Sequence, residues 1–96
     1  MAEQSVGWTF LSNHAHVLVC LARDPELRLR EIAELVGITE RAASSIIADL
    51  EEAGYLTRVK TGRRNTYKLH LRKPLRHPLE KNHRVGDLIE AVSTDQ

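Results

Sequence analysis

The chain of 96 residues has a single cysteine, Cys20, and no apolar run long enough to span a membrane. One cysteine cannot form an internal disulfide, so nothing in the sequence requires an oxidising compartment. The opening residues, MAEQSVGW, lack the basic segment and the following apolar segment of a secretory leader. These absences predict a cytoplasmic protein that has no membrane partner.

The sequence also lacks the motifs of several large enzyme classes. It contains no Gly-rich phosphate loop and no G-x-S-x-G motif. Cys20 lies within the apolar run VLVCLA, whereas a nucleophilic thiol needs a neighbouring positive charge or a base. We therefore expect neither an enzyme nor a bound cofactor.

The net charge of +1 conceals an uneven distribution along the chain. Residues 1–54 carry four Lys/Arg and nine Asp/Glu, a balance of −5. Residues 55–84 carry ten Lys/Arg and one acid, Glu80, a balance of +9. Such segregation is typical of a surface that binds a polyanion. A basic run that only keeps the chain soluble is the alternative interpretation.

The length suits one domain, and the order of patterns along the chain predicts an α+β fold. Residues 1–8 are expected to form a tail. Residues 9–73 contain three helical patterns and then two alternating strands, the order of a helix-turn-helix followed by a hairpin. Residues 74–96 hold Pro74 and Pro78 and then a short helical pattern, which predicts an arm and a C-terminal helix.

The first helix is expected to begin at Ser12 or Asn13, either of which can cap it, and to end near Arg23. Asp24-Pro25 then stops it, because the residue before a proline avoids the helical conformation. This segment is apolar nearly all round, which predicts burial on two sides. In so small a domain, we expect the second side to meet another subunit.

A short second helix should follow, with Ile32, Leu35 and Val36 on its core side. Gly37 suits a tight turn because glycine tolerates positive φ. Thr39 would then cap the third helix.

The third helix has two sides of different chemistry. The apolar side consists of Ala42, Ala43, Ile46, Ile47, Leu50 and Ala53. The opposite side carries Arg41, Ser44, Ser45 and Ala48. Small side chains on that opposite side would let the helix lie deep in a DNA major groove, which is about 12 Å wide.

Arg41 is the expected base contact, because a guanidinium can donate two hydrogen bonds to guanine O6 and N7. The hydroxyls of Ser44 and Ser45 can reach base edges or phosphates. The three acids in the second half of this helix argue that this half stays outside the groove; they are Asp49, Glu51 and Glu52.

Two strands are predicted over residues 56–60 and 66–71, joined by a turn over residues 61–65. The turn is cationic, and its candidate DNA-contacting residues are Lys60, Arg63, Arg64 and Asn65. Arginines in such a hairpin can bind phosphates or enter a narrow minor groove. These contacts make affinity fall steeply as salt rises.

Apolar residues near the C-terminus recur at helical spacing, which predicts a short amphipathic helix. We expect this helix and the first helix to form a homodimer interface, with the residues Val17, Cys20, Leu88, Ile89 and Val92. Two third helices would then meet successive major grooves, so the DNA target would be an inverted repeat.

The stretch EIAELVGITERAASSIIADLEEAGYLTRVKTGRRNTYKL resembles the winged helix-turn-helix of bacterial and archaeal regulators of the ArsR and MarR type. Within it, IIADLEEAGYL is similar to the recognition helix of these families, and GRRNTYKL is similar to their wing turn and returning strand. The resemblance implies an α+β winged helix-turn-helix and a transcriptional regulator that binds double-stranded DNA. It also implies that residues 39–48, from Thr39 to Ala48, face the groove, and that Arg63 and Arg64 form the wing tip.

The sequence departs from both types. The helix REIAELV has no cysteine, unlike the ArsR-type members that sense metals through thiolates. MarR-type proteins usually have longer terminal dimerisation helices than this chain can supply. The chain therefore most resembles a minimal, ArsR-like winged helix without metal thiolates.

Two alternatives stay open. Five histidines permit a metal site, for example one built from His16 and Cys20 with His83, Asp87 and Glu90 across a dimer. The spacing is loose, and His14 lies on another side of the first helix, so we expect no metal. A winged helix could also bind RNA or a protein instead of operator DNA.

Overall fold

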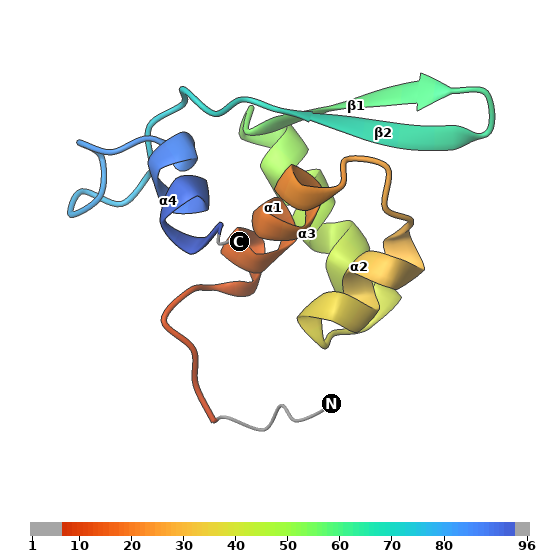
Figure 1. Cartoon of the computed structure of the whole chain (residues 1–96), viewed down its shortest axis with the longest axis horizontal. Helices are drawn as coiled ribbons and strands as arrows, with labels where there is room; N and C mark the ends of the chain where they lie inside the picture. Colours follow the sequence, from red (N-terminus) through yellow and green to blue (C-terminus); the bar gives the residue numbers. More distant parts are fainter. Residues whose placement is uncertain (1–6, 94–96) are drawn as a thin grey trace.

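The computed structural model describes residues 7–93. Its elements are α1 (Asn13–Arg23), α2 (Leu29–Val36), α3 (Glu40–Glu52), β1 (Leu56–Thr61), β2 (Arg64–Leu69) and α4 (Val85–Val92). The first three helices pack together, the hairpin extends beyond them at one end, and α4 lies at the other end (Figure 1). The predicted order of elements is confirmed. Residues 1–6 of the predicted tail and residues 94–96 at the C-terminus lie outside the described residues.

Hydroxyl side chains begin α1 and α3 where the sequence predicted. Ser12 Oγ accepts a hydrogen bond from the backbone N–H of Ala15 at 3.2 Å. Thr39 Oγ1 accepts one from the N–H of Ala42 at 3.0 Å. Each bond satisfies a donor that the first turn of a helix cannot satisfy itself, so both helix starts are fixed locally.

The start of α2 is held differently. Glu31 Oε1 accepts a hydrogen bond from the N–H of Arg28 at 2.8 Å, so Glu31 supplies half of a capping box although Arg28 is a poor capping residue. The core side of α2 consists of Ile32 and Ala33, and Leu35 is 66% exposed. The prediction that Leu35 faces the core is therefore wrong. In an eight-residue helix the buried stripe is narrow, and Leu35 lies beyond its edge.

A glycine ends α3 and turns the chain into the hairpin. Gly54 has φ of 87°, a conformation that side chains with a Cβ rarely adopt. The N–H of Tyr55 then donates to the carbonyl of Leu50 at 2.8 Å, the bond expected of a Schellman motif. This turn fixes the direction in which β1 leaves α3.

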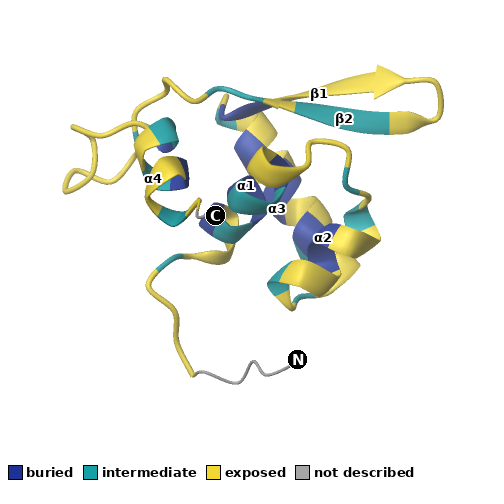
Figure 2. Cartoon of the chain, viewed as in Figure 1, coloured by how far each residue is buried: buried dark blue, intermediate teal, exposed yellow. Residues whose placement is uncertain are grey.

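One apolar core lies between the helices and continues under the start of the hairpin (Figure 2). Its fully buried large side chains are Leu21, Ile32, Ile47, Leu56, Val17 and Val85. They come from α1, α2, α3, β1 and α4. The core therefore fixes the orientation of α3 relative to the base of the hairpin.

The helix α1 is buried on two sides, but both sides are covered by the same chain. It contacts α2 and α3, and also α4 and β2. Val17 is completely buried and Ile89 is 8% exposed. The expectation that Val17 and Ile89 face a second subunit is therefore corrected: α4 folds back onto α1 and occupies the surface that the sequence assigned to a partner.

The hairpin turn is tighter than predicted. Strands β1 and β2 pair from Leu56↔Leu69 to Thr61↔Arg64, which leaves only Gly62 and Arg63 in the loop. Gly62 has φ of 65°, as two-residue hairpin loops require. The predicted five-residue turn is therefore wrong, because pairing continues to the tip. We call this hairpin, residues 56–69, the wing.

Candidate nucleic-acid interface

The side of α3 that faces away from the core carries the residues chosen from the sequence. Arg41, Ser44, Ser45 and Ala48 are all exposed, and so is the capping residue Thr39. On the opposite side Ala43, Ile46, Ile47 and Leu50 are buried. Burial of one side holds the helix in place, so the small polar side is presented to solvent in a fixed orientation.

One groove joins this exposed side to the wing. Ser44 and Ile47 of α3 line it together with Arg63 and Arg64 of the wing. We call it the helix–wing groove, and the remaining residues that line it are Glu26, Leu27, Arg28, Leu29, Arg58, Asn65 and Tyr67. Four arginines and one carboxylate border the groove, so its electrostatic potential favours an anion.

Arg64 directly follows the two-residue loop of the wing and pairs with Thr61. It belongs to β2, and its Nη2 donates a hydrogen bond to the carbonyl of Glu26 at 3.0 Å. The N–H of Tyr67 donates to the carbonyl of Pro25 at 3.1 Å. The two bonds hold β2 against the loop before α2. Arg64 therefore positions the wing as well as contributing charge, and of the two arginines predicted at the tip only Arg63 lies in the loop itself.

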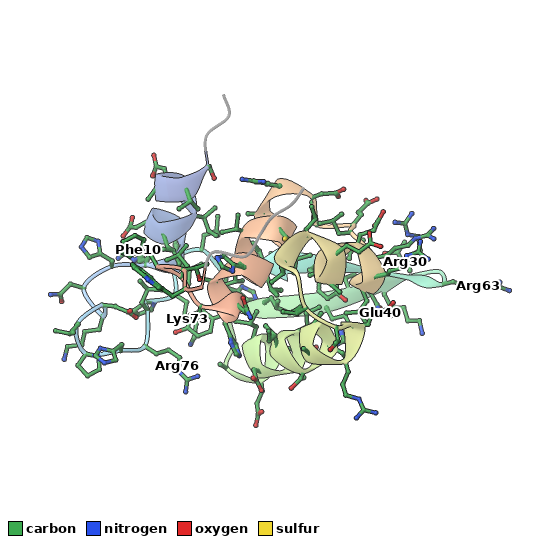
Figure 3. All side chains as sticks on the ribbon, turned by 90° about the horizontal axis from the view of Figure 1, so that it is seen from below. Phe10, Arg30, Glu40, Arg63, Lys73 and Arg76 are labelled. Atoms are coloured by element: carbon green, nitrogen blue, oxygen red, sulfur yellow. The ribbon has the colours of Figure 1, made fainter. Side chains whose placement is uncertain are left out.

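Arg63 alone carries the positive charge of the turn. It lies in the two-residue loop and projects past the end of the wing (Figure 3). Asn65, also predicted in the turn, is on β2 opposite Lys60. Partners across antiparallel strands share a face, as do alternate residues of a strand. Arg58, Lys60 and Asn65 therefore lie on one face of the wing, and Lys68 lies on the other.

The base of the wing is tied to α3 by an ion pair. Arg58 Nη2 lies 3.3 Å from Glu51 Oε1, and both side chains are about 40% exposed. A pair exposed to this degree stabilises a fold by about 0–1 kcal/mol. Its larger consequence is electrostatic, since it offsets the charge of Glu51 and holds Arg58 at the groove.

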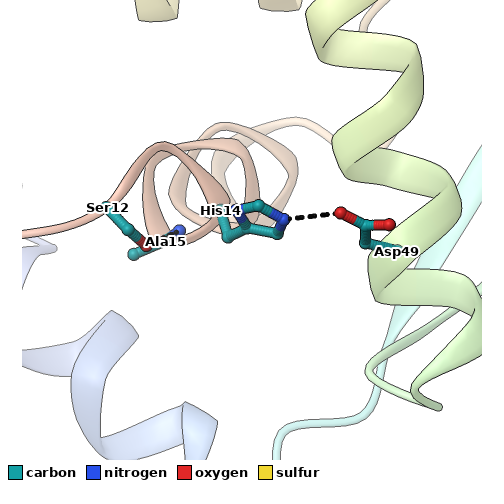
Figure 4. A network of polar contacts seen from close by, with 4 residues as sticks. All are labelled: Ser12, His14, Ala15 and Asp49. Carbon is teal, nitrogen blue, oxygen red and sulfur yellow. Dashed lines mark hydrogen bonds and ion pairs between the residues drawn. The ribbon is translucent and has the colours of Figure 1, made fainter.

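A second polar contact joins α3 to the start of α1. His14 Nε2 lies 2.9 Å from Asp49 Oδ2, beside the Ser12 cap of α1 (Figure 4). Asp49 and Glu52 also border a hollow together with Arg76. Each acid in the second half of α3 thus lies near a basic group from another element. The sequence did not reveal these contacts, because the partners are far apart along the chain.

The residues considered for a metal site are dispersed. Among residues 7–93, no three His, Cys, Asp or Glu side chains are grouped closely enough to hold a metal ion. His16 Nδ1 instead lies 3.2 Å from Asn13 Oδ1. Burial raises the pKa of the Cys20 thiol, and nearby Arg23 opposes this only in part. The thiol is therefore kept protonated.

His83 and Asp87 form a pair, with Nδ1 3.3 Å from Oδ2. The backbone N–H of Arg84 donates to the same carboxylate at 2.9 Å. The hydrogen bond from Arg84 and then that from His83 lower the pKa of Asp87. Asp87 therefore acts as a capping carboxylate at the start of α4.

The three predicted interface residues that are not in the core are half-buried: Cys20, Leu88 and Val92. Cys20 borders a hollow with Val19 and Leu35, whereas Leu88 borders another hollow with Phe10. These residues do not form one continuous surface.

No helix among residues 7–93 has the length and apolar character needed to cross a membrane.

A helix-turn-helix whose second helix borders a basic wing defines a winged-helix protein. Residues 8–64 match the model of the MarR family. The match covers more than half of the chain, and the chain belongs to this family. Membership of this family indicates a winged helix-turn-helix of the MarR type. Of the two types that the sequence resembles, the MarR type is thus the one supported.

Two solved structures are similar. The PcaV transcriptional regulator of Streptomyces coelicolor, in complex with its natural ligand, is 28% identical with a TM-score of 0.55, over 62% of this chain and 45% of that one. The MarR-family protein Rv2887 of Mycobacterium tuberculosis, in complex with salicylic acid, is 23% identical with a TM-score of 0.57, over 85% and 57%. The chain thus spans about half the length of these regulators. No curated protein matches.

Proposed function

We propose that this MarR-family chain reads double-stranded DNA, with the first half of α3 in the major groove and the wing on the backbone or in the adjacent minor groove. The observation that carries the proposal is the helix–wing groove, where Ser44 of the exposed helix side and Arg63 and Arg64 of the wing border one cationic hollow. A duplex presents phosphates on either side of a groove, so it can meet both elements at once.

The roles of the residues follow from their chemistry. Arg41, on the exposed side of α3, donates two hydrogen bonds to a guanine. Ser44 and Ser45 are short enough to let the helix backbone approach the base edges. Arg63 at the tip and Lys60 on the strand bind phosphates, which gives affinity without sequence information.

The second half of α3 stays outside the major groove. Its acids are held by groups of neighbouring elements, with Glu51 on Arg58 and Asp49 on His14. These contacts limit the repulsion between the helix and the DNA backbone. A regulator can therefore keep acids on its recognition helix without losing affinity for a polyanion.

The experiment is a titration of the full chain with labelled duplex DNA and with a structured RNA of equal charge, at roughly 50 and 200 mM salt. The proposal predicts tighter binding to the duplex, with affinity that falls steeply with salt. Equal or tighter binding to the RNA would favour an RNA-binding module. Absence of binding to either would favour a protein partner, and both outcomes would contradict the proposal.

The active form is proposed to be a homodimer, because an apolar surface is left open. Trp8 is 71% exposed and Phe10 is 91% exposed, and their rings pack edge to face with centroids 5.0 Å apart. Phe10 also borders a hollow between α1 and α4 that is lined by Leu11, Leu75 and Leu88. One chain therefore carries both a projecting aromatic pair and an apolar hollow, as a self-complementary interface requires.

This surface replaces the interface predicted from the sequence. In the proposed dimer, Leu88 contributes to the interface and Val17 does not. Light scattering of the full chain at micromolar concentration should give the mass of two copies. The variant Trp8→Ala/Phe10→Ala should give the mass of one, and a dimer unaffected by that variant would place the interface elsewhere.

A further inference from the structure

We propose that the loop of residues 70–84 is a second DNA-binding element, which contacts phosphates on the side of α3 away from the tip of the wing. We call it the basic loop. This inference rests on the proposed function, because it adds a contact to the same duplex.

The basic loop is strongly cationic. It contains Arg72, Lys73, Arg76, Lys81 and Arg84 against one acid, Glu80. All five cationic side chains are exposed. Within residues 7–93, no carboxylate lies within ion-pair distance of any of the five. None of the five therefore forms a direct ion pair of the kind that Arg58 forms with Glu51, although Arg76 shares a hollow with Asp49 and Glu52.

Backbone hydrogen bonds close the basic loop at its base. The N–H of Leu75 donates to the carbonyl of His83 at 2.9 Å, and the N–H of Val85 donates to that of Lys73 at 3.0 Å. The hydroxyl of Tyr55 donates to the carbonyl of Pro74 at 2.7 Å. The loop is thus tied to itself and to the end of α3. An ordered loop loses less conformational entropy when it binds a partner than a mobile one.

The loop lies beside the C-terminal end of α3, where the wing begins, and it extends away from the tip of the wing (Figure 1). Lys73 Nζ lies 5.5 Å from the centre of the Tyr55 ring, directly after the helix. Arg76 borders the hollow that contains Asp49 and Glu52 of α3. Figure 3 shows Lys73 and Arg76 at one end of the molecule and Arg63 at the other, in agreement with the positions of the loop and the wing in Figure 1. The cationic side chains of the loop and of the wing tip therefore lie on opposite sides of α3.

The molecule is about as long as one helical turn of DNA, so a single duplex could contact α3, the wing and the basic loop together. Its longest extent is 38 Å. One helical turn of DNA is about 34–36 Å long, and its phosphates recur along that whole length. A duplex that receives the first half of α3 therefore has phosphates in reach of both ends. The basic loop would add affinity without adding sequence information.

The test uses the full chain with two pairs of substitutions that change the net charge equally. The variant that probes the loop is Arg72→Gln/Lys81→Gln, because Arg76 also borders the hollow of the proposed dimer interface. The matched control is Arg23→Gln/Arg30→Gln, in which Arg23 ends α1, Arg30 is exposed on α2, and neither borders the helix–wing groove. Binding to a mixed-sequence duplex of about 30 base pairs is measured at roughly 50 and 200 mM salt.

Each phosphate contact makes affinity fall about 3.5-fold over that fourfold range of salt. The wild type and the control should therefore lose about tenfold more affinity between the two salt concentrations than the loop variant. Hydroxyl-radical footprinting should show that the loop variant loses protection at one edge of the site only. If circular dichroism shows the double variant to be unfolded, Lys81→Gln alone should lower the salt effect about threefold.

The outcomes separate this inference from the proposed function. If the wild type binds duplex DNA and the loop variant keeps its salt dependence and its footprint, the basic loop is only a solvated surface and this inference fails alone. If the loop variant weakens binding to a structured RNA and not to the duplex, the loop serves another partner and the inference also fails. If the wild type binds no duplex, both proposals fall.

Discussion

The two halves of α3 belong to one helix but meet different surroundings. In the first half, Arg41, Ser44 and Ser45 are exposed, and no ion pair within residues 7–93 involves Arg41. In the second half, Asp49 and Glu51 are held by His14 and Arg58. The comparison indicates that α3 is divided along its length, with one half open to solvent and the other half used to attach neighbouring elements.

The largest predicted effect is a loss of stability on substitution of a residue on the buried side of α3, which both halves of the helix share. Ile47 is 1% exposed, and Ile47→Ala should lower the free energy of unfolding by about 2–5 kcal/mol through lost burial and a cavity. Urea unfolding followed by circular dichroism measures this change. Ser45→Ala on the exposed side is the control and should stay within about 0.5 kcal/mol. Equal losses from the two variants would mean that the two sides of α3 are assigned wrongly.

A smaller loss of stability is expected when the N-cap residue of α3, Thr39, is replaced. Thr39→Ala removes the acceptor for the N–H of Ala42 and should lower the free energy of unfolding by about 1 kcal/mol. Thr39→Ser keeps the hydroxyl and should restore most of the loss. If the serine variant is as unstable as the alanine variant, the capping bond is not the cause.

The smallest effect should come from the ion pair of the second half. Glu51→Gln should change the free energy of unfolding by less than about 1 kcal/mol, because the pair is partly exposed. It should nevertheless raise affinity for duplex DNA, by up to about fivefold, since it removes an acid and frees Arg58 for phosphate. Fluorescence anisotropy at low salt measures the affinity. Arg58→Gln should lower it, and a change in the same direction for both variants would contradict this role of the pair.

Local sequence signals predicted much of this fold. The hydroxyls of Ser12 and Thr39 mark helix starts because capping needs only residues three positions apart. The two sides of α3 follow from its helical period, since one side is continuously apolar. The exposed candidates Arg41, Ser44 and Ser45 could therefore be chosen without the structure.

Features that depend on contacts between distant segments could not be predicted. The guanidinium of Arg64 donates a hydrogen bond to the carbonyl of Glu26, and the two residues are 38 positions apart in the sequence. The bond between His14 and Asp49 spans 35 positions. The apolar surface of α1 gave no indication of whether α4 or another chain would cover it. Helical periodicity predicts that a surface is buried, but it does not predict which segment or chain covers that surface.

Arg41 provides the most direct test of the central claim that the first half of α3 reads DNA. The measurement is selection of bound duplexes from a randomised library by the wild type and by Arg41→Ala, followed by affinities for the selected sequence and its single-base variants. We predict that Arg41→Ala costs about 1–3 kcal/mol on the selected sequence and loses preference for guanine at one position. A variant that selects the same sequence with unchanged affinity would contradict the account.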